Sequence, residues 1–337
     1  MKHLVVKERE GGYDASVVTA PDPEPGPGEV LVRVAASGLN RADLSQIAGR
    51  YPPPPGESPI LGMEVSGNRA DTGEAVCALL AGGGHADLVA VPIGQMMPVP
   101  KNVDLTASAG IPEAFLTAFV NLVIEGGLAV GQTTLIHAGA SGVGLAAIQV
   151  AKLLGARVAA TTRTAAKLPA LREAGADLAI DASASRFSEA LAEAWGRDAV
   201  HVILDPVGAA TLPGDLRVLA PGGRAIFLST MSGREAPLDI GLLMSKRGSL
   251  VGSTLRGRSR AEKADLVTRF RERMWPAFAD GRLRVVVDVV YPPTQAAAAF
   301  QRMRDNANVG KILINWRCSL ARQGDQCDPG ARDQRPG

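Results

Sequence analysis

Short apolar runs separated by turn-forming residues fill the chain from its start to about residue 113. The runs LVVKE, EVLVRVAAS, EAVCALL and ADLVAVP are rich in Val, Leu and Ala, and segments such as PDPEPGPGE and YPPPPGE lie between them. Apolar runs of this length bounded by Pro and Gly are typical of strands joined by tight connections. The pattern predicts a compact antiparallel β domain.

Beyond this point the apolar pattern alternates between strand and helix. Six runs are expected to be strands, at about 133–136, 157–162, 177–181, 199–208, 222–230 and 249–255. Helices are expected among them at about 145–154, 187–195 and 212–219. Such alternation is typical of a parallel, doubly wound sheet with right-handed crossovers, so the predicted fold class is α/β.

The last apolar segments do not continue the alternation. A helix is expected from about Ser259, then a strand in RVVVDVVYP, a helix at Thr294–Arg304 and a strand in KILINW. We expect this part to return to the first domain and to leave a cleft between the two bodies. The predicted division is 1–115 and 257–317 for the first domain and 116–256 for the second, with a disordered tail at 318–337 that has almost no apolar residues.

A glycine-rich turn follows the first strand of the second domain. Gly139, Gly142 and Gly144 lie in HAGASGVG together with Ser141 and Val143, and a helix and the strand RVAATT follow. Small residues at such a turn let a pyrophosphate approach the free N–H groups at the helix N-terminus, where the helix dipole favours negative charge. The unit predicts a dinucleotide site. The alternative is a plain strand-to-helix turn.

The end of the next strand bears on which dinucleotide is bound. An NAD site has an acidic residue about 20 residues after the glycines, whereas this strand ends in Thr162, Arg163 and Thr164, with Lys167 one helical turn further. Two cations and two hydroxyl groups suit a 2′-phosphate, which favours NADPH. The alternative is that Arg163 and Lys167 are the solvated start of a helix.

Composition and charge argue against several classes of protein. The net charge of +2 is small for 337 residues, and no apolar run is long enough to span a membrane, so neither a nucleic-acid nor a membrane partner is expected. The start MKHLVVKERE lacks the apolar core of a signal peptide, and a cytoplasmic location is expected. Cys77, Cys318 and Cys327 are isolated and the histidines are scattered, which argues against a disulfide framework and a metal site. His85 and His137 are expected to be packing residues.

Several separate motifs carry a resemblance to a known family. They are NRADLSQIAGRYPPPPGESPILGMEVSG at 40–67, PEAFLTAFVNL at 112–122, HAGASGVG at 137–144, GSTLRGRS at 252–259 and VGKILI at 309–314. Over residues 1 to about 316 the chain resembles the zeta-crystallin-type quinone oxidoreductases of the medium-chain dehydrogenase/reductase superfamily. Within that group it resembles the tumour-suppressor-inducible NADPH quinone oxidoreductase branch. The resemblance implies a GroES-like catalytic domain, a Rossmann NADPH-binding domain and a homodimer formed through the edge strand near SLVGST.

The resemblance also implies where the cofactor lies. Together with Ser141, Thr162, Arg163 and Lys167 of the glycine unit, the residues expected to line NADPH are Asn40, Thr117, Asn121, Gly142, Val143, Ser229, Ser253, Thr254 and Lys311. Lys311 would pair with a phosphate or orient the cleft, and the alternative is a solubility charge at a strand edge. Zinc-dependent relatives place a Cys ligand near the position of Asn40, so the asparagine here agrees with a metal-free site.

Tyr51 and Asn40 are the predicted catalytic residues. Tyr51 lies between Gly49 and a run of prolines, and its hydroxyl would hydrogen-bond an acceptor oxygen or deliver a proton; the alternative is a ring that only packs on the prolines. Asn40 would bind the nicotinamide ribose or a substrate oxygen, and the alternative is a turn cap. Asp43, close to Arg41 in sequence, is expected to form a structural ion pair rather than to act as a base.

Departures from the family pattern leave the acceptor open. The link at about 67–75 is shorter, His85 replaces a Tyr, and Phe119 and Val120 stand where relatives often have Trp-Gln. Three functions are therefore considered. They are NADPH-dependent reduction of a quinone, reduction of an activated alkene such as an α,β-unsaturated carbonyl, and a non-catalytic NADPH-binding role.

Overall fold

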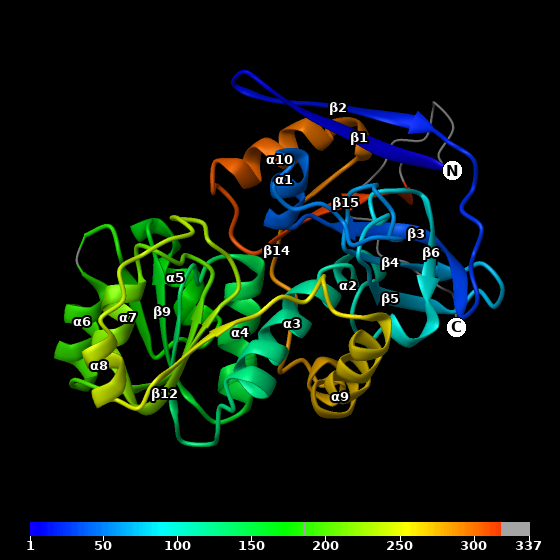
Figure 1. Cartoon of the computed structure of the whole chain (residues 1–337). Coiled ribbons are helices and arrows are strands. Elements are labelled where there is room, and N and C mark those ends of the chain that lie inside the picture. The colour runs from blue at the N-terminus through cyan, green and yellow to red at the C-terminus, as the bar shows by residue number, and fades with distance from the viewer. Residues whose placement is uncertain (185, 318–337) are drawn as a thin grey trace.

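The computed structural model describes residues 1–184 and 186–317, which form two lobes side by side (Figure 1). The predicted tail at 318–337, with Cys318 and Cys327, lies outside these residues. One lobe, mostly green in Figure 1, holds a parallel sheet, and the other holds a mainly antiparallel sheet and the N-terminal hairpin.

The parallel sheet contains six strands of the described chain, in the order β10-β9-β8-β11-β12-β13. Their bounds are β8 Thr133–Ile136, β9 Arg157–Thr162, β10 Leu178–Asp181, β11 Val200–Asp205, β12 Leu219–Phe227 and β13 Ser249–Gly252. The helices of this lobe are α4 Gly142–Leu153, α5 Leu168–Glu173, α6 Phe187–Trp195, α7 Leu212–Val218 and α8 Ile240–Ser245. Numbered from β8, the strand order is the 3-2-1-4-5-6 of a Rossmann sheet. The predicted strands and the doubly wound topology are confirmed.

The other lobe is built on a second sheet, in which β14-β15-β3-β4-β5-β7 are neighbours and β6 pairs with β3. Its strands are β3 Glu29–Gly38, β4 Glu64–Arg69, β5 Ala75–Leu79, β6 Leu88–Pro92, β7 Met96–Pro98, β14 Val287–Tyr291 and β15 Lys311–Asn315. A separate hairpin consists of β1 Lys2–Arg9 and β2 Gly12–Thr19, and the helices of this lobe are α1 Arg41–Ile47, α2 Leu105–Ser108 and α10 Ala296–Arg304. In the sheet as described, β14 and β15 pair in parallel and the other neighbouring strands pair antiparallel. The predicted antiparallel β domain is therefore confirmed.

The end of the chain completes the sheet of its beginning. Residues 313–315 of β15 pair with residues 36–38 of β3. The segment after β13 therefore crosses back to the first lobe, and the sheet of that lobe is made from two distant parts of the sequence. The residue boundaries 115/116 and 256/257 stay predictions.

Three strands of the first lobe are missing from the sequence prediction. They are β2, β4 and β7, and β4 shows why. Its sequence EVSGNR has one branched apolar residue, but it is held between β3 and β5 by antiparallel pairing. A Cβ on Gly67 would overlap the Arg33 carbonyl oxygen of β3, so the strand depends on close backbone approach rather than on an apolar pattern.

Two helices form the seam between the lobes. They are α3 Pro112–Phe119, which continues as a π-helical turn at Val120–Glu125, and α9 Arg260–Ala279. Phe115 packs against Phe278 with ring centroids 4.8 Å apart, and Phe119 against Phe270 at 5.7 Å. Four of the seven phenylalanines of the chain thus lie where one apolar core spans both lobes.

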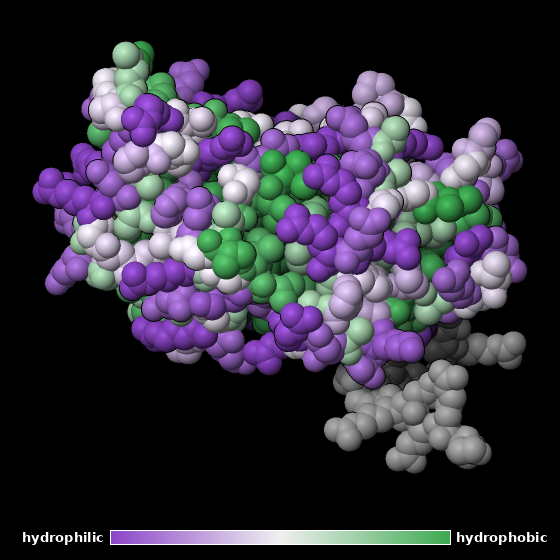
Figure 2. All heavy atoms as spheres, turned by 90° about the horizontal axis from the view of Figure 1, so that it is seen from below, coloured by the Kyte–Doolittle hydropathy of each residue, from purple (hydrophilic) through white to green (hydrophobic). Residues whose placement is uncertain are grey.

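The surface is mixed in polarity. Seen from below, one face is largely hydrophilic, with apolar side chains gathered near its middle (Figure 2). Within residues 1–184 and 186–317 no helix combines the length and apolar character needed to cross a bilayer.

Candidate active site

The glycine turn between β8 and α4 has a packed, specific geometry. Ser141 is the N-cap of α4, and its Oγ accepts a hydrogen bond from the Gly144 N–H at 3.0 Å. A Cβ on Gly144 would overlap the Ala138 carbonyl oxygen, and one on Gly139 would lie 3.0 Å from the Ala160 Cβ. These two glycines therefore let the strand and the helix pack closely.

The remaining glycine of the turn, Gly142, faces the other lobe. A Cβ on Gly142 would overlap the Lys311 Cδ. Beside it, the Gly310 N–H donates to the Ala140 carbonyl at 2.9 Å, and Ser141 and Gly310 form a parallel β-bridge. The turn is thus joined to the start of β15, and the predicted site residues Ser141, Gly142 and Lys311 come together.

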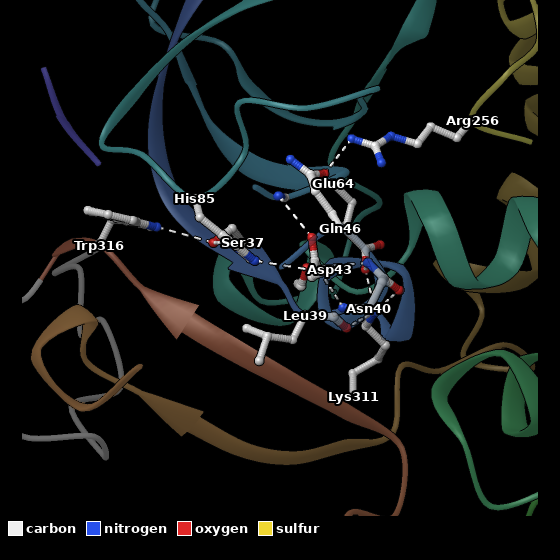
Figure 3. Close-up of polar contacts among 12 residues, drawn as sticks. Ser37, Leu39, Asn40, Asp43, Gln46, Glu64, His85, Arg256, Lys311 and Trp316 are labelled. Atoms are coloured by element: carbon white, nitrogen blue, oxygen red, sulfur yellow. Dashed lines mark hydrogen bonds and ion pairs between the residues drawn. The ribbon is translucent and has the colours of Figure 1, made fainter. Parts of the chain in front are cut away.

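A buried polar node, formed by Lys311, Glu64 and Asn40, lies at this junction (Figure 3). The Lys311 Nζ donates to the Leu39 carbonyl at 2.9 Å, to Asn40 Oδ1 at 2.8 Å and to Glu64 Oε1. The Asn40 Nδ2 also donates to Glu64 Oε1, at 3.0 Å. Lys311 is 4% exposed and Glu64 0%. All three ammonium hydrogens are occupied, so Lys311 ties β15 to the segment before α1 and to β4.

The first turn of α1 is anchored to the same lobe by Asp43. Its carboxylate accepts hydrogen bonds from the Asn40 N–H at 2.8 Å and the Gly62 N–H at 3.0 Å, and it lies 3.7 Å from His85 Nε2. Burial raises the pKa of Asp43, but His85 and the two amides lower it more, and the net shift is downward. His85 is buried and its Nδ1 contacts Ser37 Oγ at 2.8 Å. The partners of Asp43 are these groups of its own lobe, rather than Arg41.

Tyr51 lies against an arginine that the sequence analysis missed. The Arg256 guanidinium lies 5.2 Å from the centre of the Tyr51 ring, and its Nη1 donates to the Tyr51 carbonyl at 3.1 Å. Arg256 also donates to the Ala81 carbonyl and to Gln46 Oε1, both at 2.6 Å, and is 3% exposed. Burial first, and the charge of Glu113 second, raise the pKa of Tyr51, whereas Arg256 lowers it. The tyrosine is fixed by a cation, which can also stabilise a phenolate.

The seam helix carries an orphaned polar atom. Asn121 is 3% exposed; its Nδ2 donates to the Thr117 carbonyl at 2.7 Å, and its Oδ1 is buried with no hydrogen-bond partner in the described chain. It lies in the π-helical turn after α3, and such turns are frequent at functional sites. A ligand donor would satisfy the Asn121 oxygen, so the predicted pair Thr117 and Asn121 fits a cofactor at this place.

Cations gather near the end of β9. Arg163 is exposed, whereas Thr162 is buried. Lys167 donates to the Asn306 and Asn308 carbonyls, the latter at 2.7 Å. Burial first, and the charge of Arg163 second, lower the pKa of Arg41, so this arginine of the first lobe lies near Arg163. The sequence analysis named Arg41 only as a neighbour of Asp43, because Arg163 lies more than 100 positions away.

The other predicted cofactor residues follow strands of the parallel sheet. Ser229 is exposed after β12, and Ser253 is 8% exposed after β13, where its N–H donates to the Phe227 carbonyl at 2.9 Å. Thr254 comes next and is exposed. Because the carboxyl ends of parallel strands share one edge, these residues lie at the same edge of the sheet as the glycine turn.

Residues 1–184 and 186–317 do not offer a zinc site. Among the residues that the structure describes, no group of three or more His, Cys, Asp or Glu side chains is arranged to hold a metal ion. Cys77 is buried, and burial first and Glu64 second raise the pKa of its thiol. His137 is held in the core by Thr161 Oγ1 and Asp215 Oδ1, both at 2.9 Å.

A Rossmann sheet whose glycine turn adjoins a polar node on a GroES-like lobe defines a two-lobed, dinucleotide-binding oxidoreductase. Residues 26–101 match the family model of the alcohol dehydrogenase GroES-like domain, and residues 142–272 match the model described as zinc-binding dehydrogenase. The quinone oxidoreductase of Thermus thermophilus, whose structure was also solved with NADPH, is similar at 32% identity, with a TM-score of 0.80 over 94% of this chain and 100% of that chain. The chain belongs to the medium-chain dehydrogenase/reductase superfamily, with quinone oxidoreductase-like neighbours.

Other relatives are larger or carry other names. The spectinabilin polyketide synthase system protein NorB of Streptomyces orinoci is 34% identical over 316 residues, which are 90% of this chain and 14% of that protein. The chain therefore spans only a small part of that relative. The human synaptic vesicle membrane protein VAT-1 homolog is 27% identical over 330 residues, covering 90% of this chain and 84% of that protein.

Proposed function

We propose that the protein is an NADPH-dependent, metal-free reductase that transfers a hydride to a quinone. The observation that carries the proposal is Tyr51, a half-buried phenol whose ring lies 5.2 Å from the Arg256 guanidinium, in the same lobe as the Lys311–Glu64–Asn40 node. A two-electron reduction by hydride needs an acid beside the acceptor and a positive charge near the anion that forms. The Thermus quinone oxidoreductase supports this choice of acceptor. Membership of the tumour-suppressor-inducible branch stays a prediction.

The described residues fit NADPH, which when bound would supply the hydride from its nicotinamide. The N–H groups of Gly142 and Val143 would hold the pyrophosphate, because they begin α4, whereas the Ser141 N–H already donates to the Ala138 carbonyl. Arg163, with Arg41 beside it, would hold the 2′-phosphate. A mycobacterial relative with a TM-score of 0.81 was also solved with NADPH, whereas a structure described as an NAD-dependent alcohol dehydrogenase has a TM-score of 0.80. The preference for NADPH is thus part of the proposal.

Tyr51 would give its hydroxyl proton to the oxygen of the reduced acceptor. Arg256 favours this step because its charge lowers the pKa of Tyr51, against burial and Glu113, which raise it. Asn40 would contribute to the same polar wall, but its side chain already bonds to Lys311 and Glu64. We therefore assign Asn40 to positioning and Tyr51 to proton donation.

Reduction of an activated alkene is the second candidate. It is favoured by the polyketide synthase relatives, of which NorB is 34% identical and a Mycobacterium tuberculosis subunit of phenolphthiocerol/phthiocerol polyketide synthase 30%. The same Tyr51 would then protonate the enolate left by hydride addition to the β-carbon.

One screen separates these functions. Purified protein is mixed with NADPH and either a series of quinones or a series of enones and enoyl thioesters, and the loss of NADPH absorbance is followed. Turnover of quinones supports the proposal, and turnover confined to enones and enoyl thioesters refutes it in favour of the second candidate. Tight NADPH binding with no turnover by any acceptor would favour the non-catalytic role. Tyr51→Phe is expected to lower kcat by roughly 100-fold without weakening NADPH.

The predicted homodimer is part of the same proposal. Strand β13 is an edge of the parallel sheet, and the segment before it exposes Met231, Leu238, Ile240 and Met244. An edge strand beside exposed apolar side chains can pair with a second copy. Sedimentation equilibrium tests this, because a monomer at micromolar concentration would contradict it.

A further inference from the structure

A cavity of about 200 Å³ lies in the first lobe, apart from the candidate active site. Its walls come from β6, which pairs with β3 alone in the described sheet, from residues 56–60 and 80–83, and from Arg260 at the start of α9. The residues predicted for catalysis and cofactor binding lie outside its lining. Because a cavity of about 150 Å³ in another protein accommodates benzene, this space is large enough for a small ring compound.

Strand β6 turns its outer face toward the cavity. Val89 and Val91 are buried in the core of the lobe. Side chains alternate along a strand, so Leu88, Ala90 and Pro92 lie on the opposite face, and all three line the cavity. Further apolar residues of the lining are Pro23, Ile60 and Leu80. Much of the wall is therefore apolar and suits the body of a ring.

A buried acceptor without a partner lines the same cavity. Gln95 is 3% exposed, and its Oε1 has no hydrogen-bond partner among the described residues. It ends the 3₁₀ turn Ile93–Gln95, which follows β6. A Cβ on Gly94 would lie 2.7 Å from the Ala264 Cβ, so this turn is packed closely on α9. A buried oxygen that is held in this way requires a donor, which a ligand in the cavity can supply.

Two carboxylates of the lining share one cation. The Arg260 Nη1 lies 2.7 Å from Glu29 Oε1, and its Nε lies 3.1 Å from Glu57 Oε1. The amino group of Met1, which also lines the cavity, is paired with Asp22. These groups leave an excess of negative charge, which disfavours an anionic ligand.

We propose that this cavity is an accessory binding site for a small neutral phenol, whose hydroxyl donates a hydrogen bond to Gln95 Oε1. The ring packs on the outer face of β6, and the carboxylates exclude anions of the same size. The site adjoins the candidate active site, because Ala81 lines the cavity and its carbonyl accepts a hydrogen bond from Arg256 at 2.6 Å. The inference goes beyond the proposed reductase function and does not depend on it.

Phenol and fluorobenzene test this assignment, because they have nearly the same shape and only phenol donates a hydrogen bond. Their dissociation constants are measured on the full chain by ligand-observed NMR. Phenol is expected to bind the wild-type protein about 10-fold more tightly than fluorobenzene, since its hydroxyl satisfies the buried oxygen. Gln95→Met is expected to bind both compounds equally. The control is Gln301→Met, because Gln301 Oε1 is also buried without a described partner but Gln301 lies outside the cavity lining, and this variant should keep the preference for phenol.

Equal affinities of phenol and fluorobenzene for the wild-type protein overturn the assignment, and so does a preference for phenol that survives in Gln95→Met. Benzoate that binds as tightly as phenol also overturns it. If Gln95→Met does not fold, Ala90→Leu decides, because the larger side chain fills the cavity from the partly exposed face of β6. This variant should weaken both ring compounds by about 10-fold or more, and unchanged affinities refute the site. Turnover is not measured in any of these experiments, so their failure leaves the proposed reductase function standing.

Discussion

Replacing Lys311 by methionine removes the ammonium group from the polar node and tests how much this group stabilises the folded protein. Lys311→Met deletes hydrogen bonds to the Leu39 carbonyl, Asn40 Oδ1 and Glu64 Oε1, and leaves the Glu64 carboxylate buried. Two donors to that carboxylate remain, the Asn40 Nδ2 at 3.0 Å and the Glu113 N–H at 2.8 Å. Breaking a buried ion pair on one side costs about 3–5 kcal/mol, and we expect a loss in this range.

The assay is a double-mutant cycle on the free energy of unfolding, measured by urea denaturation. Glu64→Gln keeps an acceptor for the Glu113 N–H, and Glu64→Gln/Lys311→Met removes both charges. The double variant should be more stable than the sum of the single losses predicts, by about 1–3 kcal/mol. Lys152→Met is the matched control, because Lys152 pairs with Asp177 at 2.9 Å on the surface, where such pairs contribute about 1 kcal/mol or less. Equal losses for Lys311→Met and Lys152→Met, or strictly additive losses in the cycle, would refute the assignment of a buried, coupled node.

Three further predictions test other parts of the site. Arg41→Ala and Arg163→Ala should each raise the Kd for NADPH about 10-fold or more, which is the cost of one charge-assisted contact, and leave the Kd for NADH unchanged. Isothermal titration calorimetry measures both constants. Equal losses of affinity for the two cofactors would show that neither arginine contacts the 2′-phosphate. Gly142→Ala should lower the free energy of unfolding by about 1–3 kcal/mol because the new Cβ overlaps the side chain of Lys311, and combining it with Lys311→Met should relieve most of that loss. The ordinary pKa of a glutamate is 4.5, whereas burial raises the pKa of Glu113 in the folded protein to about 8, so between these values Glu113 is protonated only in the folded state. The free energy of unfolding of the wild-type protein should therefore fall with rising pH by up to about 1.4 kcal/mol per pH unit. Glu113→Gln should flatten that slope, and an unchanged slope would show that Glu113 is ionised in the folded protein.

The Rossmann half of the fold could be predicted because its elements are locally encoded. Each strand from β8 to β13 is a short apolar run, and α6 begins at Phe187 and ends at Trp195, as the pattern predicts. The first lobe was predicted less completely. Strand β4 contains Gly67 and polar residues and exists because β3 and β5 flank it, which is information that a single segment of sequence does not carry.

The candidate site divides in the same way. Ser141, Gly142 and Lys311 stand in recognisable motifs, and the structure brings them together. Glu64 and Arg256 were missed because their partners are distant in sequence: Glu64 meets Lys311 across 247 positions and Arg256 meets Tyr51 across 205. One signal was available for Glu64, since a lone carboxylate inside the apolar stretch ILGMEVSG must find a partner when it is buried.

The pairing of β15 with β3 has a consequence for synthesis on the ribosome. Strands from residues 29 to 98 cannot complete their sheet until residues 311 to 315 have been made, whereas β8 to β13 are finished by residue 252. The lobe that begins the chain is therefore the last to close, and residues 36–38 at the end of β3 lack their β15 partner while the later lobe folds. The speed of translation between residues 252 and 315 thus governs how long these backbone groups stay unpaired in the nascent protein.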